Sequence, residues 1–145
     1  MEVSNKHKGT NFEDIAKEII CNLKGISLIK DIKVDVGISN RKKGHKFDFA
    51  NLEEKVLVEC KFHEWTITGN SPSAKMSTWN EAMLYFMLAP KDFTNILFVK
   101  SSSHIKRKET LAEYYHRTYS HFIPENVEIW EYNIETELLR IHKLS

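Results

Sequence analysis

The segment Lys55–Trp65, KVLVECKFHEW, starts as an apolar strand and then places a carboxylate and an ammonium two residues apart. Side chains alternate across a strand with period two, so one face of this segment is apolar and is expected to pack on the core. That face holds Val56, Val58, Cys60 and Phe62, whereas Leu57, Glu59 and Lys61 share the other. Charges at the end of such a strand need a partner, water or a metal ion.

The segments around this strand predict a mixed central β-sheet flanked by helices. A helix is expected over 11–25, with an apolar stripe of Phe12, Ile15, Ala16, Ile19 and Leu23. Strands are expected over 31–39 and twice within 46–62, with a turn at 51–54. A helix over 78–89, capped by Thr78 and Glu81, a strand over 94–101, a helix over 108–119 and strands over 127–133 and 137–144 complete the order. The pattern is α/β, with one domain over residues 1–145.

Composition excludes several classes of protein. The chain has 145 residues, a formal net charge of +1 and two cysteines, Cys21 and Cys60, in apolar segments. These cysteines read as buried residues of a reducing compartment rather than as a disulfide framework. The beginning MEVSNKHKGTN lacks the apolar core of a secretory signal, and the run AMLYFMLAP is far shorter than the roughly 20 residues of a membrane span. We therefore expect a cytoplasmic protein without a membrane partner.

Two further carboxylates are expected to approach Glu59. Asp48 lies between Phe47 and Phe49, and if both aromatic rings face the core, Asp48 faces the other side with Glu59 across the hairpin. Cross-strand neighbours on one face lie roughly 5 Å apart and diagonal ones about 7–8 Å. Glu13, in the first turn of the first helix, flanks the apolar stripe and can reach inward. Oxygen-rich sites of this kind suit Mg²⁺ or Mn²⁺.

These residues resemble the PD-(D/E)XK, or restriction-endonuclease-like, nuclease superfamily. Asp48, a short hairpin and then Glu59-Cys60-Lys61 on an apolar strand match its signature, with Phe47 in place of the proline before the Asp. KGTNFE is similar to the Gly-x-x-x-Glu start of Holliday junction resolvases, and GHKFDF is similar to the segment before the Asp in Mrr-type restriction domains. The match runs from Gly9 to Lys61, and nothing after about Lys100 matches.

The resemblance implies an αβββαβ core and a role for each matched residue. Asp48 and Glu59 would hold Mg²⁺ or Mn²⁺ with the backbone carbonyl of Cys60, and Glu13 would be an additional ligand. Lys61 would orient the attacking water and stabilise charge on the phosphate, so the catalytic residues would be Asp48, Glu59 and Lys61.

Each assignment has a structural alternative. Glu59 and Lys61 could form a surface ion pair, which contributes about 0–1 kcal/mol to stability. Asp35, in the preceding strand, competes with Asp48 for the metal. Glu13 could close a capping box with Thr10, and the Cys60 side chain is expected to be core packing. Zinc bound by Cys60 and His63 is disfavoured, because no second pair of ligands stands at the usual spacing.

Basic residues next to the proposed site predict contacts with nucleic-acid phosphates. The loop NRKKGHK, residues 40–46, precedes Asp48, and a longer loop is expected over 63–77. The candidate phosphate-binding residues are Arg41, Lys42, Lys43, Lys46 and Lys75. A second cluster, Lys106, Arg107 and Lys108, is more simply a helix start at the surface.

The sequence therefore predicts a Mg²⁺-dependent endonuclease that hydrolyses DNA in restriction, repair or recombination. An RNA-cleaving, toxin-like nuclease with the same site is one alternative, and a non-catalytic nucleic-acid-binding protein of the same fold is another. The expected partner is nucleic acid, most simply DNA. A homodimer is compatible with this class of nuclease, but no residue identifies a dimer surface.

Overall fold

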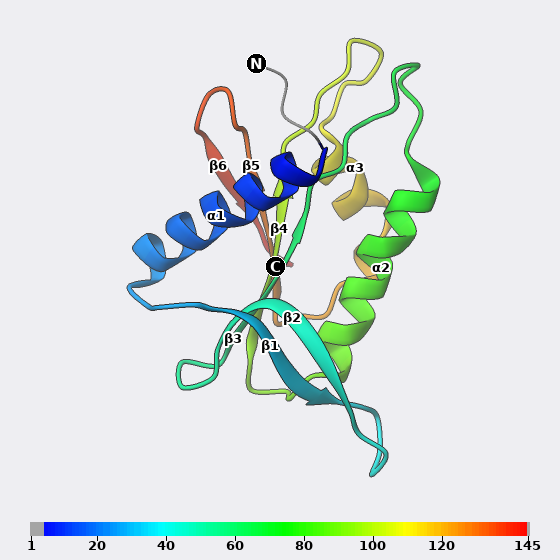
Figure 1. Cartoon of the computed structure of the whole chain (residues 1–145). Coiled ribbons are helices and arrows are strands. Elements are labelled where there is room, and N and C mark those ends of the chain that lie inside the picture. The colour runs from blue at the N-terminus through cyan, green and yellow to red at the C-terminus, as the bar shows by residue number, and fades with distance from the viewer. Residues whose placement is uncertain (1–4, 145) are drawn as a thin grey trace.

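A six-stranded mixed sheet forms the centre of the molecule (Figure 1). The computed structural model describes the backbone of residues 5–144 and the side chains of residues 11–144. The strands are β1 (Ile29–Val36), β2 (Lys43–Asn51), β3 (Val56–Lys61), β4 (Thr94–Lys100), β5 (Val127–Tyr132) and β6 (Leu139–His142), in that spatial order. β3, β4 and β5 pair in parallel, and the other pairs are antiparallel.

Helices cover both faces of this sheet. α1 (Asn5–Lys24) packs on one face through Phe12, Ala16 and Ile20, which meet apolar residues of β2–β5. α2 (Ser73–Leu88) and α3 (Leu111–Thr118) pack on the other face, followed by a short 3₁₀ helix, η1 (Ser120–Phe122). Burial on both faces explains why β3 and β4 read as nearly continuous apolar runs. The α/β class and the order of elements agree with the sequence prediction.

The apolar stripe of α1 differs from the predicted one at its end. Phe12, Ala16 and Ile20 are fully buried, but Leu23 is 62% exposed. The buried residues recur every four positions, so the contact line drifts around the helix and leaves Leu23 outside it. The helix also begins at Asn5, before the expected start.

The predicted cap of α2 was wrong, and a capping box that was not predicted stands at the start of α3. α2 begins at Ser73, so Thr78 lies inside the helix and its Oγ1 donates to the Lys75 carbonyl at 2.6 Å. A complete capping box stands at α3, where Thr110 accepts from the Glu113 N–H and the Glu113 side chain accepts from the Thr110 N–H. The spacing T-x-x-E was visible in TLAE, residues 110–113. Because α2 starts earlier, the preceding loop spans only 62–72.

The expected alternation of β2 fails at Asp48. Phe47 packs with α2 and α3, whereas Phe49 packs with α1, so the two rings lie on opposite faces of the sheet. The pairing of β1 with β2 is interrupted at Asp31 and Asp48, between the pairs Lys30–Phe49 and Ile32–Phe47, and Asp31 has a left-handed backbone with φ of 56°. Aspartate tolerates this conformation better than most residues. The local distortion turns the strand at the position of the predicted ligand.

The C-terminal part completes the sheet. β5 adds in parallel to β4, and β6 returns antiparallel to β5, as expected for the last two strands. Among residues 5–144, no helix combines the length and apolar character that crossing a bilayer requires.

Candidate active site

Asp48 and Glu59 are held together by two reciprocal backbone contacts. The Asp48 N–H donates to Glu59 Oε1 at 3.2 Å, and the Cys60 N–H donates to Asp48 Oδ2 at 2.8 Å. These two hydrogen bonds follow directly after the Phe49–Val58 pair, which is the pair of β2 with β3 farthest from the hairpin turn. The carboxylates thus replace carbonyl acceptors where the two strands separate. The expected convergence of Asp48 and Glu59 is observed.

This proximity makes ionisation of the pair unfavourable. Burial, followed by the charge of Asp48, raises the pKa of Glu59 to about 8, against the opposing effect of Lys61. Burial also raises the pKa of Asp48, although the Cys60 N–H and Lys61 oppose that shift. Like charges this close disfavour double ionisation. Glu59 therefore retains a proton at neutral pH unless a cation relieves the repulsion.

Lys61 shares the α2 side of β3 with Glu59 and is only partly exposed. Its charge lowers the pKa values of both Asp48 and Glu59, so the ammonium acts on both carboxyl groups. None of the ion pairs seen within residues 11–144 includes Lys61. Within the described residues, the alternative of a simple surface ion pair between Lys61 and Glu59 is therefore not observed. The ammonium is available to bind an anion from outside the protein.

Glu13 approaches this pair from the α1 side but has a partner of its own. Burial and the charge of Asp48 raise its pKa, and a contact with Lys30 at 3.5 Å lowers it. Because α1 begins at Asn5, Thr10 lies within the helix and is not its N-cap; the side chains of Gly9 and Thr10 lie outside the described residues. Among the described side chains, no group of three or more His, Cys, Asp or Glu forms a preassembled metal cluster.

Cys60 and His63 cannot form the zinc pair considered from the sequence. Cys60 packs on the α1 face, where burial raises the pKa of its thiol, so the side chain is core packing as expected. His63 lies on the α2 side and accepts the indole N–H of Trp79 at Nδ1, at 2.9 Å. Burial, then Lys61 and Lys75, lower the pKa of His63 to about 4, so this imidazole is neutral at pH 7.

Asp31 is a neighbour of the site that was not among the predicted residues. It lies with Asp48 where the pairing of β1 with β2 is interrupted, and its charge raises the pKa of both Asp48 and Glu13. The local sequence IKDIK carries no signal for this, because Asp31 is exposed and an ordinary strand would direct it to solvent. Only the left-handed backbone at this residue brings a third negative charge near the pair.

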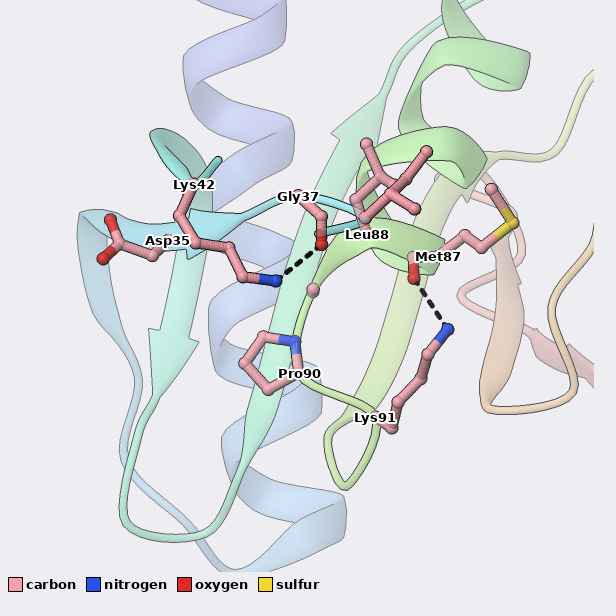
Figure 2. A pocket seen from close by; sticks show the side chains of 9 residues that line it. Asp35, Gly37, Lys42, Met87, Leu88, Pro90 and Lys91 are labelled. Carbon is pink, nitrogen blue, oxygen red and sulfur yellow. Dashed lines mark hydrogen bonds between the residues drawn. The ribbon is translucent and has the colours of Figure 1, made fainter. Parts of the chain in front are cut away.

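Asp35, the competing candidate, lies away from Glu59. It pairs with Gly44 toward the tip of the β1–β2 hairpin and lines a pocket of about 540 Å³ between this hairpin and the end of α2 (Figure 2). Inside the pocket, Lys42 Nζ donates to the Gly37 carbonyl at 2.7 Å and Lys91 Nζ to the Met87 carbonyl at 3.1 Å. None of the lining residues belongs to the carboxylate pair, so this pocket is separate from the candidate site.

The predicted phosphate-binding residues do not form one surface. Arg41, Lys42 and Lys43 are exposed on the hairpin, which projects away from the N-terminal end of α1 in Figure 1. Lys46 faces Lys33 in the register of β1 with β2. Lys75 is exposed in the first turn of α2, and its charge lowers the pKa of His63. Comparisons of the chain with protein-family models, curated proteins and solved structures find no match.

Proposed function

We propose that this protein is a divalent-cation-dependent endonuclease that hydrolyses phosphodiester bonds in DNA. The observation that carries the proposal is the Asp48–Glu59 pair, built into the backbone where β2 and β3 separate, with Lys61 beside it on β3. A restriction-endonuclease-like core accounts for the αβββαβ order of the first elements and for this position of the pair. The cellular setting proposed is a cytoplasmic one.

The donor set suits Mg²⁺ or Mn²⁺. Asp48, Glu59 and the backbone carbonyl of Cys60 supply hard oxygen donors, which these ions prefer, and the ions complete their shells with water and substrate oxygens. The raised pKa of Glu59 supports the same interpretation, because a bound cation would favour the ionised carboxylate against the effects of burial and of the Asp48 charge. Glu13 is paired with Lys30 and would join only by leaving that partner.

The residues of the chain divide the chemistry as follows. A bound divalent ion would lower the pKa of an attacking water and neutralise charge on the phosphate. Asp48 and Glu59 would hold the ion, with their orientations fixed by the N–H groups of Cys60 and Asp48. The Lys61 ammonium would orient the water and donate to a phosphate oxygen as negative charge develops there.

The test is single-turnover cleavage of supercoiled, linear and branched DNA, and of structured RNA, with Mg²⁺ and with Mn²⁺. Lys61→Ala should lower the cleavage rate by about 10²–10³, the usual effect of removing one preorganised donor. Folding should persist, because a partly exposed lysine leaves no core cavity. Lys17→Ala, an exposed lysine on α1, is the matched control and should cut like the parent.

Each outcome separates the alternatives. Cleavage of RNA alone would replace DNA by RNA as the substrate. Binding without cleavage of any substrate would favour a non-catalytic nucleic-acid-binding protein. Equal rates for Lys61→Ala and the parent would remove Lys61 from the mechanism.

A further inference from the structure

Two loops lie side by side at the end of the sheet where β3 stops at Lys61. Residues 62–72 connect β3 to α2, and residues 101–110 connect β4 to α3. Because β3 and β4 are parallel, both loops leave from the same ends of their strands. They stand together at the top of Figure 1, in green and yellow, opposite the β1–β2 hairpin.

Contacts between the loops hold them in one arrangement. The His104 ring lies 2.7 Å from the Ile67 carbonyl through Nε2, and Arg107 Nε donates to the Gly69 carbonyl at 2.7 Å. Gly69 has φ of 87°, and a Cβ there would lie 2.9 Å from the His104 ring, so this position requires glycine. The Thr66 N–H closes the first loop on the Asn70 carbonyl at 3.0 Å.

Packing around the buried Trp65 supports these contacts from below the loops. Trp65 is buried, its backbone N–H donates to Ser102 Oγ at 3.1 Å, and the Arg107 guanidinium lies 4.3 Å from the centre of its ring. Tyr114 of α3 meets the same ring edge to face at 5.2 Å. The two loops therefore form a stiff projection anchored on the α2–α3 side of the sheet.

The tips of this projection are apolar and fully exposed. Ile67 is 97% exposed and Ile105 is 98% exposed, so neither packs on the protein. The charged residues around them are mainly cationic: Lys75, Lys106 and Lys108 are exposed and form no ion pair within the described residues. The nearby acids are neutralised, since Glu64 pairs with Lys100 and Glu109 with Arg117.

We propose that Ile67 and Ile105 form an apolar wedge that enters the base stack of duplex DNA beside the scissile phosphate. The charge of the projection suits a polyanion, and branched aliphatic side chains are used elsewhere to unstack base steps and bend DNA. Ile67 follows Lys61 by six residues, so this part of the wedge lies in the loop that directly continues the strand of the proposed catalytic lysine. The inference rests on the proposed nuclease function and adds a preference for DNA that is easily kinked or already distorted.

The experiment measures binding without catalysis. Duplexes and a branched junction carrying 2-aminopurine at successive positions are titrated with protein in EDTA, and both affinity and fluorescence are followed. The parent should raise the fluorescence at one or two adjacent positions, because unstacking relieves its quenching. Ile67→Ala/Ile105→Ala should lose this rise and bind about tenfold more weakly, with an unchanged salt slope.

Two control variants separate the wedge from its surroundings. Ile38→Ala removes another isoleucine, 87% exposed, in the β1–β2 hairpin and should behave like the parent. Lys106→Ala/Lys108→Ala should keep the fluorescence rise at saturating protein and lower the salt slope by about 0.9 for each phosphate that the variant no longer neutralises. All the substituted side chains are exposed, so circular dichroism should show unchanged folding.

Three results would overturn the wedge. Equal fluorescence and affinity for the parent and the double isoleucine variant would reject it, while cleavage by the parent would leave the nuclease proposal intact. Self-association of the parent that the double variant lacks would make the tips an interface between copies of this chain. A parent that binds no nucleic acid would reject the wedge and the proposed function together, whereas unstacking without cleavage in Mg²⁺ or Mn²⁺ would reject the nuclease alone.

Discussion

The buried carboxylate Glu131 and the pair Asp48–Glu59 lie in the same sheet, but their pKa values are shifted in opposite directions. Glu131 on β5 is only 1% exposed, accepts from Ser101 Oγ at 2.7 Å and lies 2.8 Å from His142 Nε2. Burial raises the pKa of Glu131, but the hydrogen bonds from His142 and Ser101 outweigh it and the net pKa is lowered. At Asp48 and Glu59 the net pKa shift is upward, because burial is the largest cause at both groups and their hydrogen bonds and Lys61 do not offset it; the charge of Asp48 adds to the shift of Glu59.

This difference separates a buried carboxylate that serves the fold, Glu131, from a pair that is suited to bind a ligand, Asp48 and Glu59. Ser101 and His142 satisfy the two oxygens of Glu131 within the protein, so this group contributes to folding without an external partner. At the Asp48–Glu59 pair, burial and the charge of Asp48 leave the ionised form of Glu59 without full compensation, and an external cation can supply it. Local departures of this kind from the most stable arrangement are expected where a protein binds or reacts.

The largest expected effect is on cation binding. Asp48→Ala should abolish the weak binding of Mn²⁺ expected in a paramagnetic titration of the parent, because it removes one of the two carboxylates. Asp35→Ala is the matched control, since Asp35 lies on β1 toward the hairpin tip and should not affect binding. Equal binding by Asp48→Ala and the parent would remove Asp48 from the ligand set and end the contrast with Glu131.

The next largest effect is on the free energy of unfolding when Glu131 is replaced. Glu131→Ala should lower the free energy of unfolding by about 3 kcal/mol near pH 7, because His142 and Ser101 lose a buried acceptor. Since the pKa of Glu131 is lowered on folding, its contribution is present above the ordinary pKa of glutamate and is lost as the pH falls through the folded value. Urea denaturation between acidic and neutral pH measures both.

Glu109→Ala is the control for this effect. Glu109 forms a surface ion pair with Arg117, and its loss should cost less than about 1 kcal/mol. Similar losses in the two variants would show that Glu131 is not stabilised by its buried partners. Cleavage by folded Glu131→Ala should match the parent.

Glu59→Gln should act in the opposite direction and stabilise the protein. Folding raises the pKa of Glu59 to about 8, so the folded state binds more protons than the unfolded one between the ordinary pKa and about 8. The stability of the parent therefore falls as the pH rises through this window. Glutamine cannot ionise, and the variant should exceed the parent by about 1–2 kcal/mol at pH 9, with little difference near pH 4.

The same denaturation series, run without divalent ions, provides the measurement. Glu53→Gln, an exposed turn residue, should show no such dependence on pH. A Glu59→Gln protein that is less stable than the parent at pH 9 would mean that the pair is satisfied as it stands, like Glu131.

The smallest effect concerns charge outside both groups. Reversal at Lys42 and Lys43 should weaken DNA binding at low salt and reduce its salt dependence, with little sequence preference, because contacts with phosphates carry no base information. Both lysines lie on the distant hairpin, so Mn²⁺ binding should not change. An unchanged salt slope would show that the hairpin is merely solvated.

Sequence patterns within single segments predicted which helices and strands form, but not the residues at which they begin and end. Period-two alternation identified the apolar face of β3 correctly, because the residues that it places together pack on α1. The start of α2 was misjudged because Thr78 and Glu81 have the spacing of a cap, while the true first turn contains no strong signal. The capping box of α3 was equally readable and was overlooked.

The sequence by itself determined the α/β class, the order of the elements and the pairing of Asp48 with Glu59, since a short hairpin forces these neighbours together. Tertiary structure alone decided the rest. Asp31 joins the site only through a left-handed residue in β1, and Phe47 and Phe49 separate only because β2 is distorted at Asp48. The loops of Ile67 and Ile105 contact each other only because two parallel strands end at the same side of the sheet. Each depends on contacts between residues far apart in the chain, which local periodicity does not encode.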